Sequence, residues 1–235
     1  MVLDIQGRVG SPAAGARGRA TASVGEQETE MAMLIGRKLG MTQIYEESGK
    51  VTPVTVVEAG PCPILQIKTP QKEGYSAIQI GFDETRESRV TAPMNGVFRK
   101  AGVKPLRMLR EVRVDDTSGY KVGDSLNVKV FEGAKKVHVT GTTKGRGFTG
   151  TTKRHGFRTG RMTHGNTSRR APGSVGSNTT PARILKGKRM AGRLGADIRT
   201  MRNLSLVQID AENNLLFIEG AIPGANNGLV FVRTA

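Results

Sequence analysis

The residues of this chain best suited to chemistry are the lysines and arginines of residues 141–202, which we call the basic block. The block holds 15 of the chain's 36 Lys and Arg but only one of its 20 Asp and Glu, Asp197. It therefore carries a formal charge of +14, and the rest of the chain carries +2. Because a Lys or Arg side chain beside a phosphate releases condensed counterions, this concentration of charge suits binding to a nucleic acid.

The basic block lacks the pattern of a folded core. It contains twelve glycines, and its few apolar residues follow neither a period of two nor one of three and a half. So little apolar surface cannot offset the entropy of ordering the backbone, so the block is expected to be mobile without a partner. A solvated charged face usually mixes both signs, whereas residues 141–195 contain no carboxylate. The block is therefore predicted to bind a polyanion.

Thirteen of these bases and two histidines are the candidate nucleic-acid-binding residues. They are Lys144, Arg146, Lys153, Arg154, His155, Arg158, Arg161, His164, Arg169, Arg170, Arg183, Lys186, Lys188, Arg189 and Arg193. The chain has no Trp and only ten Phe and Tyr, so extensive stacking on bases is not the expected mode of binding. Recognition of backbone and shape by Arg and Lys is favoured instead.

Residues 145–150, with the sequence GRGFTG, match the dinucleotide-binding fingerprint GxGxxG letter for letter. That fingerprint also needs an apolar helix after it and an acidic residue about twenty positions on. The next six residues, TTKRHG, cannot open a buried helix, and the residues about twenty positions on are Arg169 and Arg170. A nucleotide cofactor is therefore not expected.

No constellation of residues predicts catalysis. The chain has no Walker loop, and Ser174 in the sequence PGSVG does not match the nucleophile elbow of hydrolases. His138, His155 and His164 have no metal-ligand spacing with Cys62 or with acids. We expect His138 on a strand, and we expect neither an enzyme nor a metal site, cofactor or small-molecule substrate.

The length of 235 residues allows one large domain or two small ones. A single cysteine excludes an internal disulfide and suits a reducing compartment. No apolar run approaches the roughly twenty residues of a membrane span.

Residues 1–30 differ in composition from the rest of the chain. They are rich in Ala, Gly, Arg and Ser, then turn acidic, and they show no apolar periodicity. We interpret them as a disordered extension or a mis-assigned start, because the ordered pattern begins at Met31 or Met33. An organellar transit peptide is the alternative.

Outside the basic block, short apolar segments alternate with turn residues, which predicts strands. One short helix is expected at residues 93–101, with a proline in its first turn and Gly102 after its end. A hairpin is expected across the turn at residues 211–214. The expected strands are residues 33–45 (interrupted at Gly36 and Gly40), 51–59, 64–68, 75–82, 105–114, 125–131, 135–141, 204–210, 214–220 and 228–233.

Strands at this spacing predict an all-β barrel or sandwich with little helix. Because strands flank the basic block on both sides, the block is an insertion into one β domain. The expected organisation is a β domain of residues 31–140 and 203–235, with residues 141–202 as a long, glycine-rich basic extension.

The basic block also carries a resemblance to a known family. The sequences FEGAKKVHVTGTTKGRGFTGTTKRHGFRTGRMTHGN and RRAPGSVGSNTTPARILKGKRMAGRLG resemble the signature region of large-subunit ribosomal protein L-three, in its bacterial form. The likeness covers about residue 31 to the C-terminus. Two departures are His138, where the family usually has Asp or Asn, and residues 1–30, which have no counterpart in the family.

The resemblance implies a translation-protein-type β-barrel on the surface of the large ribosomal subunit. It implies an extension that penetrates the ribosomal RNA toward the peptidyl-transferase centre, and early binding near the 3′ end of the 23S RNA that nucleates assembly. Implied neighbours are ribosomal proteins fourteen and nineteen, and the implied location is the cytoplasmic ribosome, with no membrane contact.

The residues alone leave one alternative, a free-standing RNA or DNA chaperone that uses the same basic block. Fractionation of cell extract separates the two hypotheses. A ribosomal protein co-migrates stoichiometrically with large subunits, whereas a chaperone leaves a free or DNA-bound pool.

Overall fold

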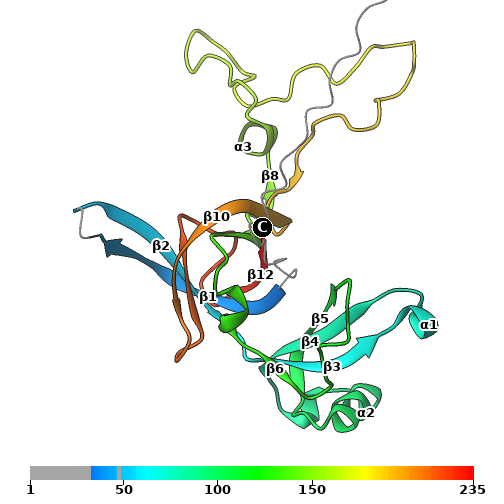
Figure 1. The fold of residues 1–235 in the computed structure, drawn as a ribbon. Coiled ribbons are helices and arrows are strands. Elements are labelled where there is room, and N and C mark those ends of the chain that lie inside the picture. The colour runs from blue at the N-terminus through cyan, green and yellow to red at the C-terminus, as the bar shows by residue number, and fades with distance from the viewer. Residues whose placement is uncertain (1–32, 47–48) are drawn as a thin grey trace, which may run out of the picture.

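The computed structural model describes residues 33–46 and 49–235, so the interpretation of residues 1–30 falls outside the described part of the chain. The structure is mainly β, as predicted, and it contains a closed six-stranded antiparallel barrel (Figure 1). Around the barrel the strand order is β1-β12-β7-β10-β11-β2. These strands are β1 (Met33–Tyr45), β2 (Val51–Ala59), β7 (Lys136–Thr142), β10 (Ile198–Asp210), β11 (Leu215–Glu219) and β12 (Leu229–Thr234).

Period-two alternation places the barrel's apolar side chains inside. Val137 and Val139 of β7 are fully buried, as are Leu216 and Ile218 of β11, because alternate residues of a strand face the same side. The predicted hairpin between β10 and β11 is confirmed. Its turn is held by Asp210, whose carboxylate accepts hydrogen bonds from the backbone N–H groups two and three residues on, at 3.0 and 3.1 Å.

Strand β1 is continuous where the sequence suggested interruptions at its two glycines. It pairs with β2 from Gly36 to Tyr45 with a register shift between Lys38 and Gly40. At Gly36 the two backbones are so close that an added Cβ would lie 2.5 Å from the carbonyl oxygen of Glu58. The first glycine therefore permits close strand packing, whereas the second adjoins a bulge.

The residues expected to form one β domain build two sheets. The second, which we call the outer sheet, has the order β5-β4-β3-β6, and Phe98 of a helix packs against Leu65 and Leu106 of this sheet. The predicted short helix is confirmed, and Gly102 ends it with a φ of 69°. The elements are β3 (Cys62–Lys68), α1 (Pro70–Glu73), β4 (Ala77–Glu84), a 3₁₀ turn η1 (Glu87–Arg89), α2 (Ala92–Ala101), β5 (Leu106–Arg113), β6 (Ser125–Leu126) and a second 3₁₀ turn η2 (Val128–Phe131).

The segment expected as a strand at residues 125–131 is a strand only over its first two residues. Val128 and Phe131, three apart, are both fully buried, while Val130 between them is exposed. A spacing of three places side chains on one face of a 3₁₀ turn, not of a strand. The burial required by tertiary packing thus overrides the strand propensity of this apolar run.

The barrel and the outer sheet share one apolar core. Buried residues of the outer sheet, such as Ile78 and Ile80, belong to the same cluster as the barrel interior. Two polar contacts also join them: Arg37 of β1 forms an ion pair with Asp83 of β4 at 2.8 Å, and the guanidinium of Arg110 lies 4.8 Å from the ring centre of Phe231 in β12. The two sheets therefore form one folded unit, from which the segment inserted between β7 and β10 extends.

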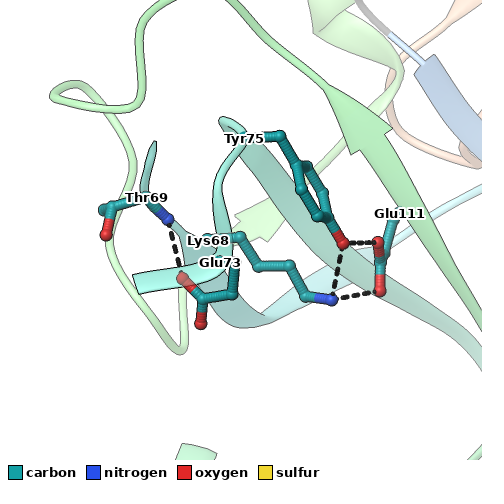
Figure 2. A network of polar contacts seen from close by, with 5 residues as sticks. All are labelled: Lys68, Thr69, Glu73, Tyr75 and Glu111. Carbon is teal, nitrogen blue, oxygen red and sulfur yellow. Dashed lines mark hydrogen bonds and ion pairs between the residues drawn. The ribbon is translucent and has the colours of Figure 1, made fainter. Parts of the chain in front are cut away.

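Charged groups of the outer sheet are paired with one another (Figure 2). Lys68 Nζ lies 2.6 Å from Glu111 Oε1 and 2.9 Å from the hydroxyl of Tyr75, and that hydroxyl donates to Glu111 Oε2 at 2.8 Å. These hydrogen bonds raise the pKa of Lys68 and lower that of Glu111. Beside them, the Glu73 carboxylate accepts from the backbone N–H of Thr69 at 3.1 Å, closing the first turn of α1.

The inserted segment leaves the barrel between β7 and β10 and opens into wide loops (Figure 1). Both strands run past the limits expected from the sequence, β7 to Thr142 and β10 from Ile198. We therefore define the extension as residues 143–197. It contains β8 (Phe148–Thr149), α3 (Thr151–His155) and β9 (Gly192–Arg193).

We predict that the barrel and outer sheet fold without the extension. Replacing residues 144–196 by Asn-Gly joins Thr143 to Asp197, whose backbones already share a hydrogen bond of 2.9 Å, and a two-residue turn fits such a pair. Thermal unfolding followed by circular dichroism should stay cooperative, and RNA affinity should fall severely. An unfolded product would show that the extension contributes to the core.

A pair of glycine substitutions in β1 tests the packing of the barrel. Gly36→Ala should lower the free energy of unfolding by roughly 1–3 kcal/mol because the Cβ meets backbone that cannot move freely. Gly40→Ala is the matched control, because no atom lies within 4 Å of its added Cβ. Its effect should stay within about 0.5 kcal/mol. If chemical denaturation shows equal losses of unfolding free energy in the two variants, the close approach of β1 and β2 at Gly36 is contradicted.

Candidate nucleic-acid interface

The candidate binding residues lie along the whole extension and face solvent. Thirteen of the fifteen are exposed, and only Arg154 and His155 are half-buried. The tertiary structure therefore does not gather them into one pocket. It distributes them over a protruding surface in three parts, which are a neck next to the barrel, a short helical node and the distal loops at residues 156–191.

The positive charge of the extension is not neutralised by ion pairs within the described residues. Among the described residues, every ion pair lies in the barrel, its hairpin or the outer sheet, and none involves a base of residues 141–202. In and beside the outer sheet, by contrast, bases form ion pairs with acids. Lys68 pairs with Glu111 at 2.6 Å, and Arg99 pairs with Glu87 at 2.8 Å. An exposed, unpaired array of bases is the arrangement that attracts a polyanion.

The neck, formed by residues 143–147 and 194–197, continues the pairing of β7 and β10 as a two-stranded ribbon. Arg146 N–H donates to Leu194 O at 2.8 Å, and Leu194 N–H donates to Gly147 O at 3.0 Å. Between these bonds and the barrel the chain bends at Gly195, which has a φ of 75°. A Cβ at Gly195 would overlap the carbonyl oxygen of Lys144, so only glycine fits both the conformation and the close approach.

The helical node consists of α3 packed against the returning chain. Arg154 Nη1 donates to the carbonyl oxygen of Met190 at 2.8 Å, and His155 Nε2 lies 3.0 Å from the same oxygen. The Arg154 guanidinium also lies over Gly192, where a Cβ would be 2.6 Å from Nη1. Arg154 and His155 therefore hold the two arms of the extension together, an internal role that the sequence did not indicate.

The distal loops have little internal structure apart from one small turn. Gly160 N–H donates to Arg169 O at 2.9 Å, and the Asn166 side chain bonds Arg161 O and Ser168 N–H at 2.8 and 3.0 Å. This turn brings four candidates into one loop: Arg161, His164, Arg169 and Arg170. All of residues 167–191 are exposed.

Sequence reasoning counted two further bases in the block's charge without naming them as candidates. Arg199 and Arg202 are both exposed on the first half of β10, next to the neck. The sequence already placed both within residues 141–202, so the concentration of charge there was the signal that could have included them. The pairing of β10 with β7 places them at the root of the extension.

Two basic side chains close to the neck have structural roles. Lys38 is buried, and its Nζ donates to Ile222 O at 3.1 Å; burial and the nearby Lys144 lower its pKa. His138 lies on β7, as predicted, and its Nδ1 accepts a hydrogen bond of 3.0 Å from the backbone N–H of Asn203. Asn203 has a φ of 56° at an irregularity of β10, so the imidazole supplies an acceptor that the strand partner does not.

The other segments and residues considered for chemistry, the GxGxxG match and Cys62, have structural roles. In residues 145–150, Phe148 and Thr149 pair with Arg193 and Gly192 as a short ribbon, so this segment is not the strand-to-helix turn of a dinucleotide site. Burial raises the pKa of the Cys62 thiol to about 12, which keeps it protonated and unreactive. Over residues 33–46 and 49–235, no group of three or more His, Cys, Asp or Glu could hold a metal, and no helix could cross a membrane.

A closed β-barrel that carries a protruding extension of exposed, unpaired bases has the arrangement of a structural protein suited to contact with a polyanion. Comparison with known sequences identifies the family. The model of the family Ribosomal protein L3 matches residues 113–215. The large ribosomal subunit protein uL3 of Corynebacterium aurimucosum is 54% identical over 209 residues, 88% of this chain and 96% of that protein.

Similar relatives occur outside that genus. The protein of the same name from Fervidobacterium nodosum is 50% identical over 205 residues, 87% of this chain and 99% of that protein. The chain therefore belongs to the ribosomal protein L3 family, in its bacterial form, and the resemblance seen in the sequence is confirmed. This family is structural, so the prediction that the chain is not an enzyme is confirmed as well.

The role of Arg154 leads to a prediction within the extension. Arg154→Ala should speed amide hydrogen exchange in peptides that cover residues 148–155 and 190–193, because it removes the bond to Met190 O. Lys153→Ala is the matched control, since it removes the same charge from an exposed neighbour on α3. Indistinguishable exchange in the two variants would contradict an internal role for Arg154.

Proposed function

We propose that this protein is a structural constituent of the large ribosomal subunit that binds the 23S ribosomal RNA directly through its extension. Family membership supports the ribosome as its setting, and the relatives are large-subunit proteins by name. The observation that carries RNA binding is the extension itself, with its exposed bases and its lack of ion pairs among the described residues. The place of action is the cytoplasmic ribosome.

In this proposal the two parts of the protein divide the work. The barrel and outer sheet have a buried core and paired charges, so they remain folded on the surface of the particle. The extension has almost no core of its own and enters the RNA, where phosphates of converging strands neutralise its bases. It reaches toward the peptidyl-transferase centre, and its binding near the 3′ end of the RNA occurs early and nucleates assembly.

The exposed apolar side chains of the extension support burial in RNA. Phe148 is 82% exposed and Leu185 is 64% exposed, although neither faces the barrel core. Such side chains stack on unpaired bases or pack against ribose when RNA surrounds them. Arginine adds planar contacts of the same kind together with its charge.

Ribosomal proteins fourteen and nineteen are the neighbours that family membership suggests. Their contact is proposed for the barrel side of the molecule. The hairpin of β1 and β2 supports this placement, because Met41, Tyr45 and Val51 on it are exposed and uncharged. A surface of this composition suits contact with protein better than contact with phosphate.

The dependence of RNA binding on salt tests the proposal. The logarithm of affinity for a 23S RNA fragment should fall linearly with the logarithm of salt concentration, with a slope of about 0.7–0.9 per phosphate neutralised. The double variant R169A/R170A should reduce that slope by about 1.4–1.8 if each arginine neutralises one phosphate.

The matched control is K100A/K121A, which removes two exposed bases beside the outer sheet, one on α2 and one in the loop between β5 and β6. Its slope should equal that of the wild type. A salt-independent affinity of the wild type, or equal slopes for both variants, would overturn the proposed mode of binding.

A further inference from the structure

A small niche lies at the neck, where the extension leaves the barrel. It has a volume of about 270 Å³ and is lined by Thr143, Lys144, Arg146, Leu194, Gly195, Asp197 and Arg199. At about 30 Å³ per water molecule, that volume has room for several water molecules and so for more than a single ion. The niche is a shallow hollow that is open to solvent and lined by both arms of the neck.

The backbone around the niche is fixed by two sets of hydrogen bonds. On the barrel side, Thr143 N–H donates to Asp197 O at 2.9 Å, and the Thr143 hydroxyl bonds both the N–H and the carbonyl of Asp197 at 3.2 Å. On the far side, Arg146 and Leu194 are joined at 2.8 Å. The niche thus exists before any ligand arrives, which lowers the entropy cost of binding.

Between these two sets the backbone offers unused donors. The N–H groups of Lys144, Gly145, Gly195 and Ala196 make no hydrogen bond to another group of the described chain. Gly195 and Ala196 both have positive φ, at 75° and 55°, which breaks the ladder at this point. Free backbone N–H groups beside cationic side chains favour an anion.

The side chains give the niche a positive charge. Lys144, Arg146 and Arg199 are exposed, and none forms an ion pair within the described residues. The buried Lys38 adds a further cation close to Lys144. A phosphate is the anion that so many cations and N–H donors suit in a protein whose extension binds RNA.

Asp197 is the feature that a simple phosphate site does not explain. It is the only acid in the basic block, and it lines this niche. Its backbone N–H and carbonyl bond Thr143, but its carboxylate has no hydrogen bond or ion pair within residues 33–46 and 49–235. An acid beside a phosphate is repelled unless it accepts a hydrogen bond from the same ligand, and the donor next to a phosphate in RNA is the ribose 2′-hydroxyl.

We propose that the neck niche binds one RNA nucleotide by its backbone, with Lys144, Arg146 and Arg199 on the phosphate and the Asp197 carboxylate accepting the 2′-hydroxyl. This assignment rests on the proposed RNA-binding function and adds to it a residue that distinguishes RNA from DNA. It also fixes the point at which RNA holds the root of the extension. The distal bases contact phosphates, which RNA and DNA share.

The experiment compares the affinities of the full-length protein for single-stranded oligouridylate and for the matching oligodeoxyuridylate. The wild type should prefer the RNA, and Asp197→Ala should reduce the ratio of the two affinities by about tenfold, the worth of one charge-assisted hydrogen bond. Asp197→Asn should keep most of the preference, because its amide oxygen still accepts. Since only the side chain changes, the backbone bonds to Thr143 remain.

A double-mutant cycle separates the niche from the rest of the extension. In the background K144A/R146A/R199A, adding Asp197→Ala should no longer alter the ratio, because the nucleotide is not held there. In the charge-matched background R183A/K186A/K188A, Asp197→Ala should still reduce the ratio about tenfold.

The outcomes also separate this inference from the proposed function. If the wild type binds neither oligonucleotide and no 23S RNA fragment, RNA binding itself is wrong. If the wild type binds but Asp197→Ala leaves the ratio unchanged, or raises both affinities equally, then Asp197 only repels phosphate and the niche assignment is wrong. An effect of the same size in both triple backgrounds would place the discrimination outside the niche.

Discussion

The pairing of β7 with β10 closes the barrel, and the same two strands start the extension. Val137 and Val139 of β7 face the core, and Ile198, Arg199 and Thr200 of β10 pair with residues 140–142 at the end of β7 that leads into the extension. Because backbone hydrogen bonds join the two arms again beyond the break at Gly195 and Ala196, the direction of the extension is set by a folded β-structure. A basic segment tethered by a flexible linker would have no such direction.

The distribution of charge follows from the same division. Acids in the barrel and outer sheet lie next to bases, as in the ion pairs of Asp83 with Arg37 and of Glu111 with Lys68. The extension contains one acid, and its bases repel one another in the absence of a ligand. Within the protein its order therefore depends on a few contacts, such as those of the Arg154 and His155 side chains with the carbonyl oxygen of Met190, and in the proposed function the RNA neutralises its bases. Stability and binding reside in different parts of the chain, so each can meet its own physical requirement.

Several features of the extension depend on backbone geometry more than on side chains. Gly195 turns the chain where no other residue fits, and Gly192 leaves room for the guanidinium of Arg154. These contacts divide the extension into a rigid neck, a node and loose distal loops. In the proposed function the neck holds a preformed niche, and the distal loops, which have few internal contacts, take their shape from the surrounding RNA.

The family, the mainly β fold and the location of the positive charge could all be predicted from the sequence, because they depend on local composition and on period-two patterns. The sequence also located α2, since a proline at its start and a glycine at its end are local signals. The division of the strands into a barrel and an outer sheet required the tertiary structure, because alternation shows which residues face a core but not which strand is the partner. The 3₁₀ turn at Val128–Phe131 also required the tertiary structure, because it depends on the burial of these two residues, three positions apart, in the core. The neck niche was also beyond the sequence, because it joins Lys144 and Arg146 to Asp197 and Arg199 across some fifty residues of chain. The β7–β10 ladder and the backbone hydrogen bonds between Arg146 and Leu194 bring these two segments together.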